Sequence, residues 1–198
     1  MQPVDEWARG WHHAVALLRH LREGGQPAQL STALRVGDQH VYADVPLVYA
    51  RFYGMNVEYG QSSMFAWGGP LFMAAAYTSN AVSNANARNR AAREAAPQWR
   101  EHTTARTVVT GDQTACLVNG QWLAFSHSAV VELGADLSRY TCLLTFGEVE
   151  PVMLHGSAAP YVAVLLSYLL YGPGRLETLP FLEPLRPVPP APSQITPA

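Results

Sequence analysis

Seven histidines are present in this chain, and three of them fall in one predicted helix near its start. His13 and His20 share a face of that helix but stand about 10 Å apart along its axis. Two histidines that bind one zinc ion from a helix are normally four residues apart. His12 and His13 are adjacent and point in different directions. We therefore expect no metal site.

A second group of residues has types that could support nucleophilic catalysis. The Ser126–Ser128 run places two hydroxyls beside His127, but neighbouring strand residues face opposite sides of a sheet. His127 and His155 both end predicted strands, where hydrogen-bonded polar residues at a sheet rim are the commoner case. Cys116 and Cys142 have apolar neighbours, which predicts buried, reduced thiols; a disulfide between them stays open.

Acid–base and phosphate chemistry have equally weak support in the sequence. Glu148 and Glu150 flank a predicted turn, where solvated charge is expected. The glycines at 68–69 are followed by Pro70 and lack the lysine of a phosphate-binding loop. The sequence predicts a protein that is not an enzyme, with no cofactor and no small-molecule substrate. A pocket joining His127, His155 and a carboxylate would favour an enzyme instead.

Composition narrows the class of partner. Hydrophobic residues make up 48% of the 198 residues and charged residues 14%, against roughly a quarter in an average protein. All thirteen basic residues are arginine and the net charge is −2, so no basic surface for nucleic acid is expected. This low charge favours a protein partner, a homo-oligomer or a membrane surface. The acidic start of the chain, without a signal peptide, predicts a cytoplasmic, bacterial-type protein.

Two helices and a set of strands should position these residues. Residues 5–23 repeat apolar side chains every three or four positions, which predicts an amphipathic helix within an N-terminal unit, 1–25. A turn and strand at 36–45 is separated by Pro46 from a second apolar segment at 47–53. The helix stripe consists of Trp7, Trp11, Ala14, Leu18 and Leu21.

The second half of the chain has the pattern of an antiparallel sheet followed by a helix. Asn119-Gly120 between apolar runs is a strong hairpin signal. Ser157 is a suitable N-cap for an apolar helix at 158–171, and Gly172 should end it. A proline-rich tail, 173–198, is predicted to be disordered. The predicted strands cover 106–110, 114–118, 121–127, 130–133, 140–146 and 149–155.

An uncharged window from 61 to 87 precedes this sheet. Pro70 can open a helix that runs to 96, apolar in its first half and arginine-bearing in its second. The apolar part of this helix is too short to span a membrane. We therefore expect the helix to be buried in the domain or against a second copy of the chain, or else to lie on a membrane surface. The candidate interaction surface consists of Phe65, Trp67, Leu71, Phe72, Met73, Arg88, Arg90 and Arg93.

The strands and closing helix resemble the pleckstrin-homology-like (PH-like) barrel, including GRAM-like and bacterial PH-like domains. The resemblance rests on 107–112, on 117–125, and on the strands at 130–133, 140–146 and 152–156 before the helix. Residues 36–43 are similar to the segment that often precedes the first strand in the bacterial members. It implies an α+β fold: a small antiparallel barrel over 36–172, capped by the C-terminal helix, with the 70–96 helix inserted and residues 40–53 as the seventh strand. The expected core and cap residues are Trp122, Phe125, Phe146, Tyr161, Leu165 and Leu169.

This resemblance implies a binding module. In eukaryotic PH-like domains the ligand is often a phosphoinositide held by basic loops, but the corresponding loops here carry one arginine and two aspartates. Such loops suit a polyanionic headgroup poorly. The sequence therefore predicts a non-catalytic scaffold that acts through protein–protein contacts or self-association. The alternative is a peripheral membrane protein that uses the helix within 65–93.

Overall fold

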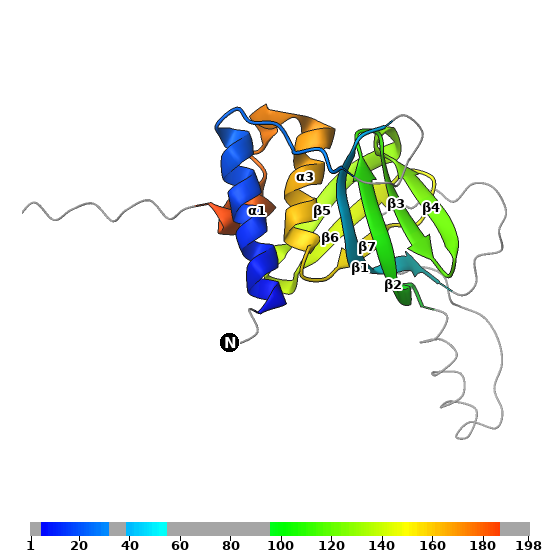
Figure 1. The fold of residues 1–198 in the computed structure, drawn as a ribbon. Helices are drawn as coiled ribbons and strands as arrows, with labels where there is room; N and C mark the ends of the chain where they lie inside the picture. Colours follow the sequence, from blue (N-terminus) through cyan, green and yellow to red (C-terminus); the bar gives the residue numbers. More distant parts are fainter. Residues whose placement is uncertain (1–4, 32–38, 55–95, 187–198) are drawn as a thin grey trace, which may run out of the picture.

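The computed structural model describes residues 5–31, 39–54 and 96–186. It has an α+β architecture in which one antiparallel sheet packs against the C-terminal helix, and the N-terminal helix covers the other side of that helix (Figure 1). The elements are α1 (Glu6–Arg22), β1 (Val41–Tyr53), β2 (Gln98–Thr110), β3 (Gln113–Val118), β4 (Gln121–Ser126), η1 (His127–Ala129), β5 (Val130–Asp136), η2 (Leu137–Arg139), β6 (Thr141–Phe146), β7 (Val152–His155), α3 (Ala159–Tyr171), η3 (Pro173–Arg175) and η4 (Pro180–Leu185).

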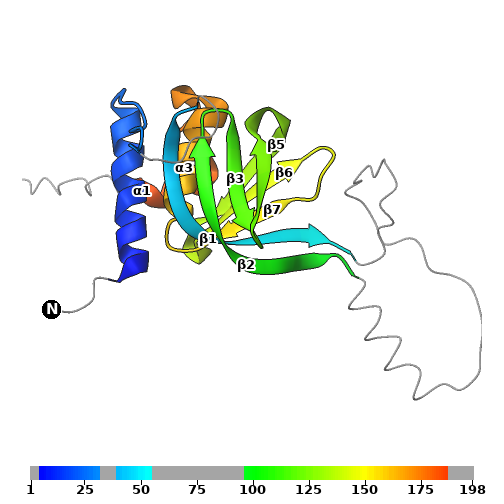
Figure 2. The ribbon, with the colours of Figure 1, turned by 45° about the vertical axis from the view of Figure 1, so that its right-hand side comes forward.

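The seven strands pair in the order β4-β3-β2-β1-β7-β6-β5. Strands β1–β4 and β5–β7 are two meanders, joined where β1 pairs with β7 over Val48–Arg51. The segment at 41–53 thus adds the seventh strand, as expected. Among the described strands β4 and β5 pair on one side only, so the sheet is curled but not closed into the expected barrel. The ends of β1 and β2 project from it as a ribbon (Figure 2).

Strand β1 runs without a break through Pro46, contrary to the prediction of two segments. Pro46 pairs with Arg106 of β2, whereas β7 reaches only as far as Val48. Because β1 has no second neighbour at this level, the missing proline N–H costs no ladder bond there. Strand β5 likewise continues to Asp136, beyond residue 133 where the predicted strand ended.

The Asn119-Gly120 hairpin forms as predicted. Both residues have positive φ, 50° for Asn119 and 81° for Gly120, as a two-residue turn of this kind requires. The turn pairs Val118 with Gln121 and sets the register of β3 and β4. This register determines which backbone groups of β4 point away from β3.

Helix α1 packs against α3 on the side away from the sheet (Figure 1). The carboxylate of Asp5 caps it by accepting a hydrogen bond from the Trp7 N–H at 3.1 Å. Leu17 joins the buried face, while Trp7 stays 40% exposed and packs edge-on against Tyr140. The buried residues of the helix are Gly10, Ala14, Leu17, Leu18 and Leu21.

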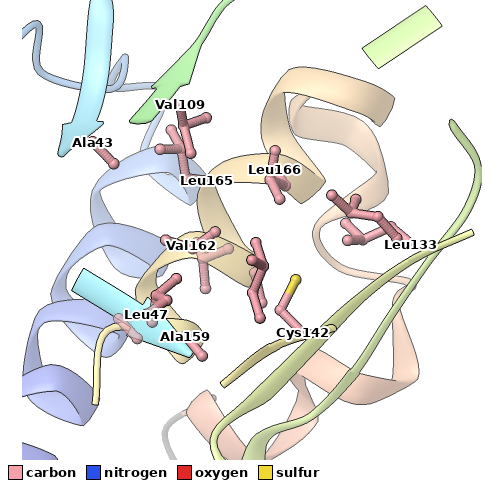
Figure 3. Close-up of a cluster of buried hydrophobic side chains, with 14 of the residues drawn as sticks. Ala43, Leu47, Val109, Leu133, Cys142, Ala159, Val162, Leu165 and Leu166 are labelled. Carbon is pink, nitrogen blue, oxygen red and sulfur yellow. The ribbon is translucent and has the colours of Figure 1, made fainter. Parts of the chain in front are cut away.

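Helix α3 forms the centre of the core (Figure 3). Gly172, at φ 76°, ends it as expected. Ser157 does not act as the N-cap: its hydroxyl instead donates to the Glu6 carboxylate of α1 at 2.9 Å. Val162, Leu165 and Leu166 of α3 are fully buried, so this helix fills the curl of the sheet as the apolar pattern predicts.

The expected core and cap residues differ in burial. Phe146 and Leu165 are buried, whereas Phe125, Tyr161 and Leu169 are partly buried. Trp122 is 44% exposed because it lies on the edge strand β4. Its assignment to the core is therefore wrong.

Residues 173–186 differ from the predicted disordered tail. They form the short helices η3 and η4, and Leu176, Leu182 and Leu185 are buried against the helical layer. The guanidinium of Arg186 donates to the Glu177 carbonyl at 2.7 Å and to two neighbouring carbonyls, which holds these turns together. Apolar side chains at suitable spacing thus outweigh the proline content. Residues 187–198 lie outside the described part of the chain.

Candidate binding groove

A groove of about 400 Å³ runs along β4, at the open side of the sheet. This volume is at the low end of the range for ligand pockets. One wall is β4 itself, through residues 122–126. The opposite side includes Phe146 at the end of β6 and Val149 in the following turn, and further lining comes from Arg51 and Ala129.

The backbone of β4 presents hydrogen-bonding groups at this side. Val118 and Gln121 flank a two-residue turn and are therefore a hydrogen-bonded pair. Such pairs alternate with non-hydrogen-bonded ones along an antiparallel ladder. Trp122, Ala124 and Ser126 thus direct their N–H and C=O groups away from β3. Among the described strands, none pairs with β4 on that side.

The two edges of the sheet are protected differently. Strand β5 carries the charged residue Glu132 and has a register shift next to it. In addition, the N–H of Leu133 donates to the Tyr171 hydroxyl at 3.1 Å. Charges and bulges of this kind keep edge strands from pairing with other chains. Strand β4, Gln-Trp-Leu-Ala-Phe-Ser, has neither a charged residue nor a proline. It is the edge that is suited to accept another strand.

A row of stacked aromatic rings extends from the groove to Tyr49 of β1. Phe146 and Phe125 stack with centroids 5.6 Å apart, and Phe125 stacks on Tyr49 at 6.2 Å. Tyr49 is fully buried, and its hydroxyl has no hydrogen-bond partner among the described residues. This burial raises the pKa of Tyr49, so the phenol stays neutral.

One ion pair provides the charge at the groove. The Nη2 atom of Arg51 donates to Glu150, and both side chains are mostly buried, at 24% and 20% exposure. The Nε atom of Arg51 is buried and has no acceptor among the described residues. A buried donor without a partner costs about 1–3 kcal/mol, and because this atom has almost no accessible surface it is shielded from the groove.

The histidines predicted at the sheet rim do not come together. His127 is buried beside the β2–β3 turn, where its Nδ1–H donates to the Gly111 carbonyl at 3.0 Å. Its Nε2 then accepts from the Thr114 hydroxyl at 3.0 Å. His155 instead bonds the Arg139 carbonyl and contacts the Trp7 ring. Among the described residues the two rings share no hydrogen-bond partner.

His127 should make the stability of the protein depend on pH. Burial lowers its pKa below the ordinary value of 6.5, so the unfolded chain takes up a proton more readily than the folded one. The free energy of unfolding should therefore fall as the pH drops from about 8 to about 5. His127→Gln should flatten this dependence in urea titrations across that range, and His102→Gln, at an exposed site, should not. An unchanged slope in His127→Gln would exclude His127 as the cause.

Both cysteines are free and buried, as predicted. Burial raises the pKa of Cys116 to about 11 and that of Cys142 to about 12. Such thiols stay protonated at neutral pH and are poor nucleophiles. Their surroundings therefore suit packing better than reaction.

The sequence-predicted interaction surface, from Phe65 to Arg93, lies outside the described residues. The membrane-surface hypothesis therefore stays a prediction. Neither helix of the described part has the length and apolar character needed to cross a membrane. In the same part of the chain, no three residues of the types His, Cys, Asp and Glu are grouped so as to hold a metal ion.

Sequence reasoning did not identify the groove, although one signal for it was present. The hairpin made β4 a strand, and the absence of charge and proline in 121–126 marks an edge without the usual protection. No local sequence signal indicates that β4 lies at the edge of the sheet or that Arg51 lines the groove beside it. No family model, curated protein or solved structure matches this chain, so the groove is interpreted from its own geometry.

Proposed function

We propose that this protein is a non-catalytic binding module that holds an extended, uncharged segment of a partner protein along β4. The observation that carries the proposal is the unprotected edge of β4 beside a groove with aromatic walls. An added strand would use the outward N–H and C=O groups of Trp122, Ala124 and Ser126, and alternate side chains would enter the groove.

A partner segment suits this groove better than a second copy of the same chain. A strand added to β4 would lie next to the groove residues Phe146, Val149 and Ala129. The β4 strand of a second copy would bring its own sheet and groove wall to the same place. Dimerisation through β4 is therefore an outcome that would count against the proposal.

The finer assignment of the fold to the PH-like class is part of the proposal. Seven antiparallel strands in two meanders, followed directly by a helix that packs in the curl, support it. The open side between β4 and β5 is a departure from a closed barrel. In this proposal, the partner segment binds at this open side of the sheet.

Selection of peptides from a random display library tests the function. The wild type should enrich peptides with apolar residues at alternate positions. Ala124→Pro removes an outward N–H at an edge position where proline is tolerated, and it should weaken binding of these peptides by about 10-fold, the value of one hydrogen bond. Ala124→Ser keeps the N–H and should bind within about two-fold of wild type.

Two results would contradict this function. The first is a library that yields no peptide whose binding depends on the N–H of Ala124, with folding of both variants verified by thermal denaturation. The second is a dimer in light scattering that Ala124→Pro, but not Ala124→Ser, converts to a monomer. That second result would assign β4 to self-association instead.

A further inference from the structure

The side chains of β4 are divided between the two faces of the sheet. Leu123 and Phe125 are partly buried and pack against the core. The residues between and beside them, Trp122, Ala124 and Ser126, are exposed. Because successive side chains of a strand point to opposite faces, a strand added to β4 has the same two faces. Two of its residues, at alternate positions, face the groove beside Leu123 and Phe125, and their neighbours face outward.

The outward face of β4 carries one large apolar side chain, that of Trp122. It lines the groove and is 44% exposed. On the β3 side its cross-strand neighbour is Leu117. On the other side no described strand pairs with β4, so Trp122 has a cross-strand neighbour on one side only. Tryptophan is a frequent anchor residue of protein interfaces because its ring buries a large apolar area.

The surface around Trp122 is apolar and without net charge. Val149, in the turn after β6, also lines the groove and is 46% exposed. The charge of Arg51 is offset by Glu150, and the other groove-lining residues are uncharged. Exposed apolar side chains that adjoin a groove are typical of interaction sites. An uncharged partner segment therefore complements this surface better than a charged one.

Resting on the function proposed above, we infer that Trp122 is a specificity-determining residue that selects an aromatic side chain on the outward face of the bound segment. The selected residue lies opposite Trp122, where aromatic cross-strand pairs are favourable. It directly adjoins one of the two residues that face the groove.

This arrangement defines the class of partner. The bound segment is an uncharged stretch with two large apolar residues at alternate positions and an aromatic residue beside one of them. It thus differs from an amphipathic strand, which carries apolar side chains on one face only.

Two peptides that differ only on the outward face test this inference. Acetyl-Thr-Trp-Val-Thr-Val-Trp-Thr-amide reads the same in both directions, so a tryptophan lies opposite Trp122 whichever way the peptide runs. In the comparison peptide, threonine replaces both tryptophans. Titrated into the full chain and followed by ¹H–¹⁵N NMR, both should shift the backbone signals of β4. The tryptophan peptide should bind about fivefold more tightly, the effect of one aromatic cross-strand pair.

Trp122→Thr should abolish this preference, so that the two peptides bind within about twofold of each other. Threonine favours strands and position 122 is an exposed edge site, and thermal denaturation verifies the fold. Val131→Thr is the matched control, because Val131 is 70% exposed on β5 and lies outside the groove lining. The fivefold preference should persist in that variant.

The failure of this inference can be told apart from failure of the binding function. If the two peptides bind the wild type equally, or if Trp122→Thr keeps the preference, Trp122 does not select the ligand, and the binding module stands. Library peptides that bind while neither probe shifts the β4 signals would also show that the inference is wrong. If neither the probes nor any library peptide binds, the proposed function fails together with the inference.

Discussion

Replacing Leu165 by alanine is expected to lower the free energy of unfolding by about 3 kcal/mol, within the range for emptying a fully buried leucine site. Leu165 is 0% exposed and belongs to the buried cluster at the centre of the protein (Figure 3). Its loss removes contact between α3 and the curled sheet and leaves a cavity that close-packed neighbours cannot fill. Urea denaturation with an unchanged m value would measure the change.

Leu169→Ala is the matched control, because it makes the same chemical change one turn further along the same helix. Leu169 is only partly buried, so its loss should cost about 1 kcal/mol. Equal losses for the two variants would mean that α3 does not turn its Leu165 face into the sheet. The arrangement of core and sheet described above would then be wrong.

Gly10→Ala is expected to destabilise the protein by about 2 kcal/mol, although alanine favours helix over glycine by about 1 kcal/mol. A Cβ atom at Gly10 would lie 1.8 Å from the carbonyl oxygen of Ser157. That oxygen belongs to the backbone just before α3, so the clash cannot be relieved by a side-chain rotation. Helix α1 must move away from α3, which loosens the packing of Ala14 and Leu18.

Hydrogen exchange and thermal denaturation together measure this effect. The amides of α1 should exchange faster in Gly10→Ala than in the wild type, while those of β2 and β3 change less. His13→Ala, on the exposed side of the same helix, should leave both measurements near the wild-type values. A Gly10→Ala protein as stable as the wild type would show that α1 does not pack on α3 at this distance.

Elements defined by local signals could be predicted well from the sequence. Apolar periodicity located α1 and α3, and Asn119-Gly120 located a hairpin because both positions need positive φ. These signals act between neighbours in the chain and do not depend on the rest of the fold. Gly172 ended α3 for the same reason.

Predictions that depended on neighbours across the fold were less successful. Pro46 was expected to divide β1, but β7 begins to pair with β1 two residues later, at Val48, so the strand continues. Ser157 has the right type for an N-cap, yet Glu6 of α1 engages its hydroxyl. The prolines after 173 suggested disorder, yet Leu176 and Leu182 find an apolar surface to bury against.

The sequence by itself determined the N-terminal helix, the strands of the second half, the hairpin, the buried thiols and an apolar helix long enough to fill a curled sheet. The tertiary structure alone decided that β4 is an edge, that Trp122 faces solvent and that Arg51 lies beside Phe125 and Phe146. The physical reason is the distance along the chain over which each kind of interaction acts. Turn and helix preferences arise within a few residues, whereas an edge, an unpaired donor and a groove exist only when strands far apart in the chain are placed together.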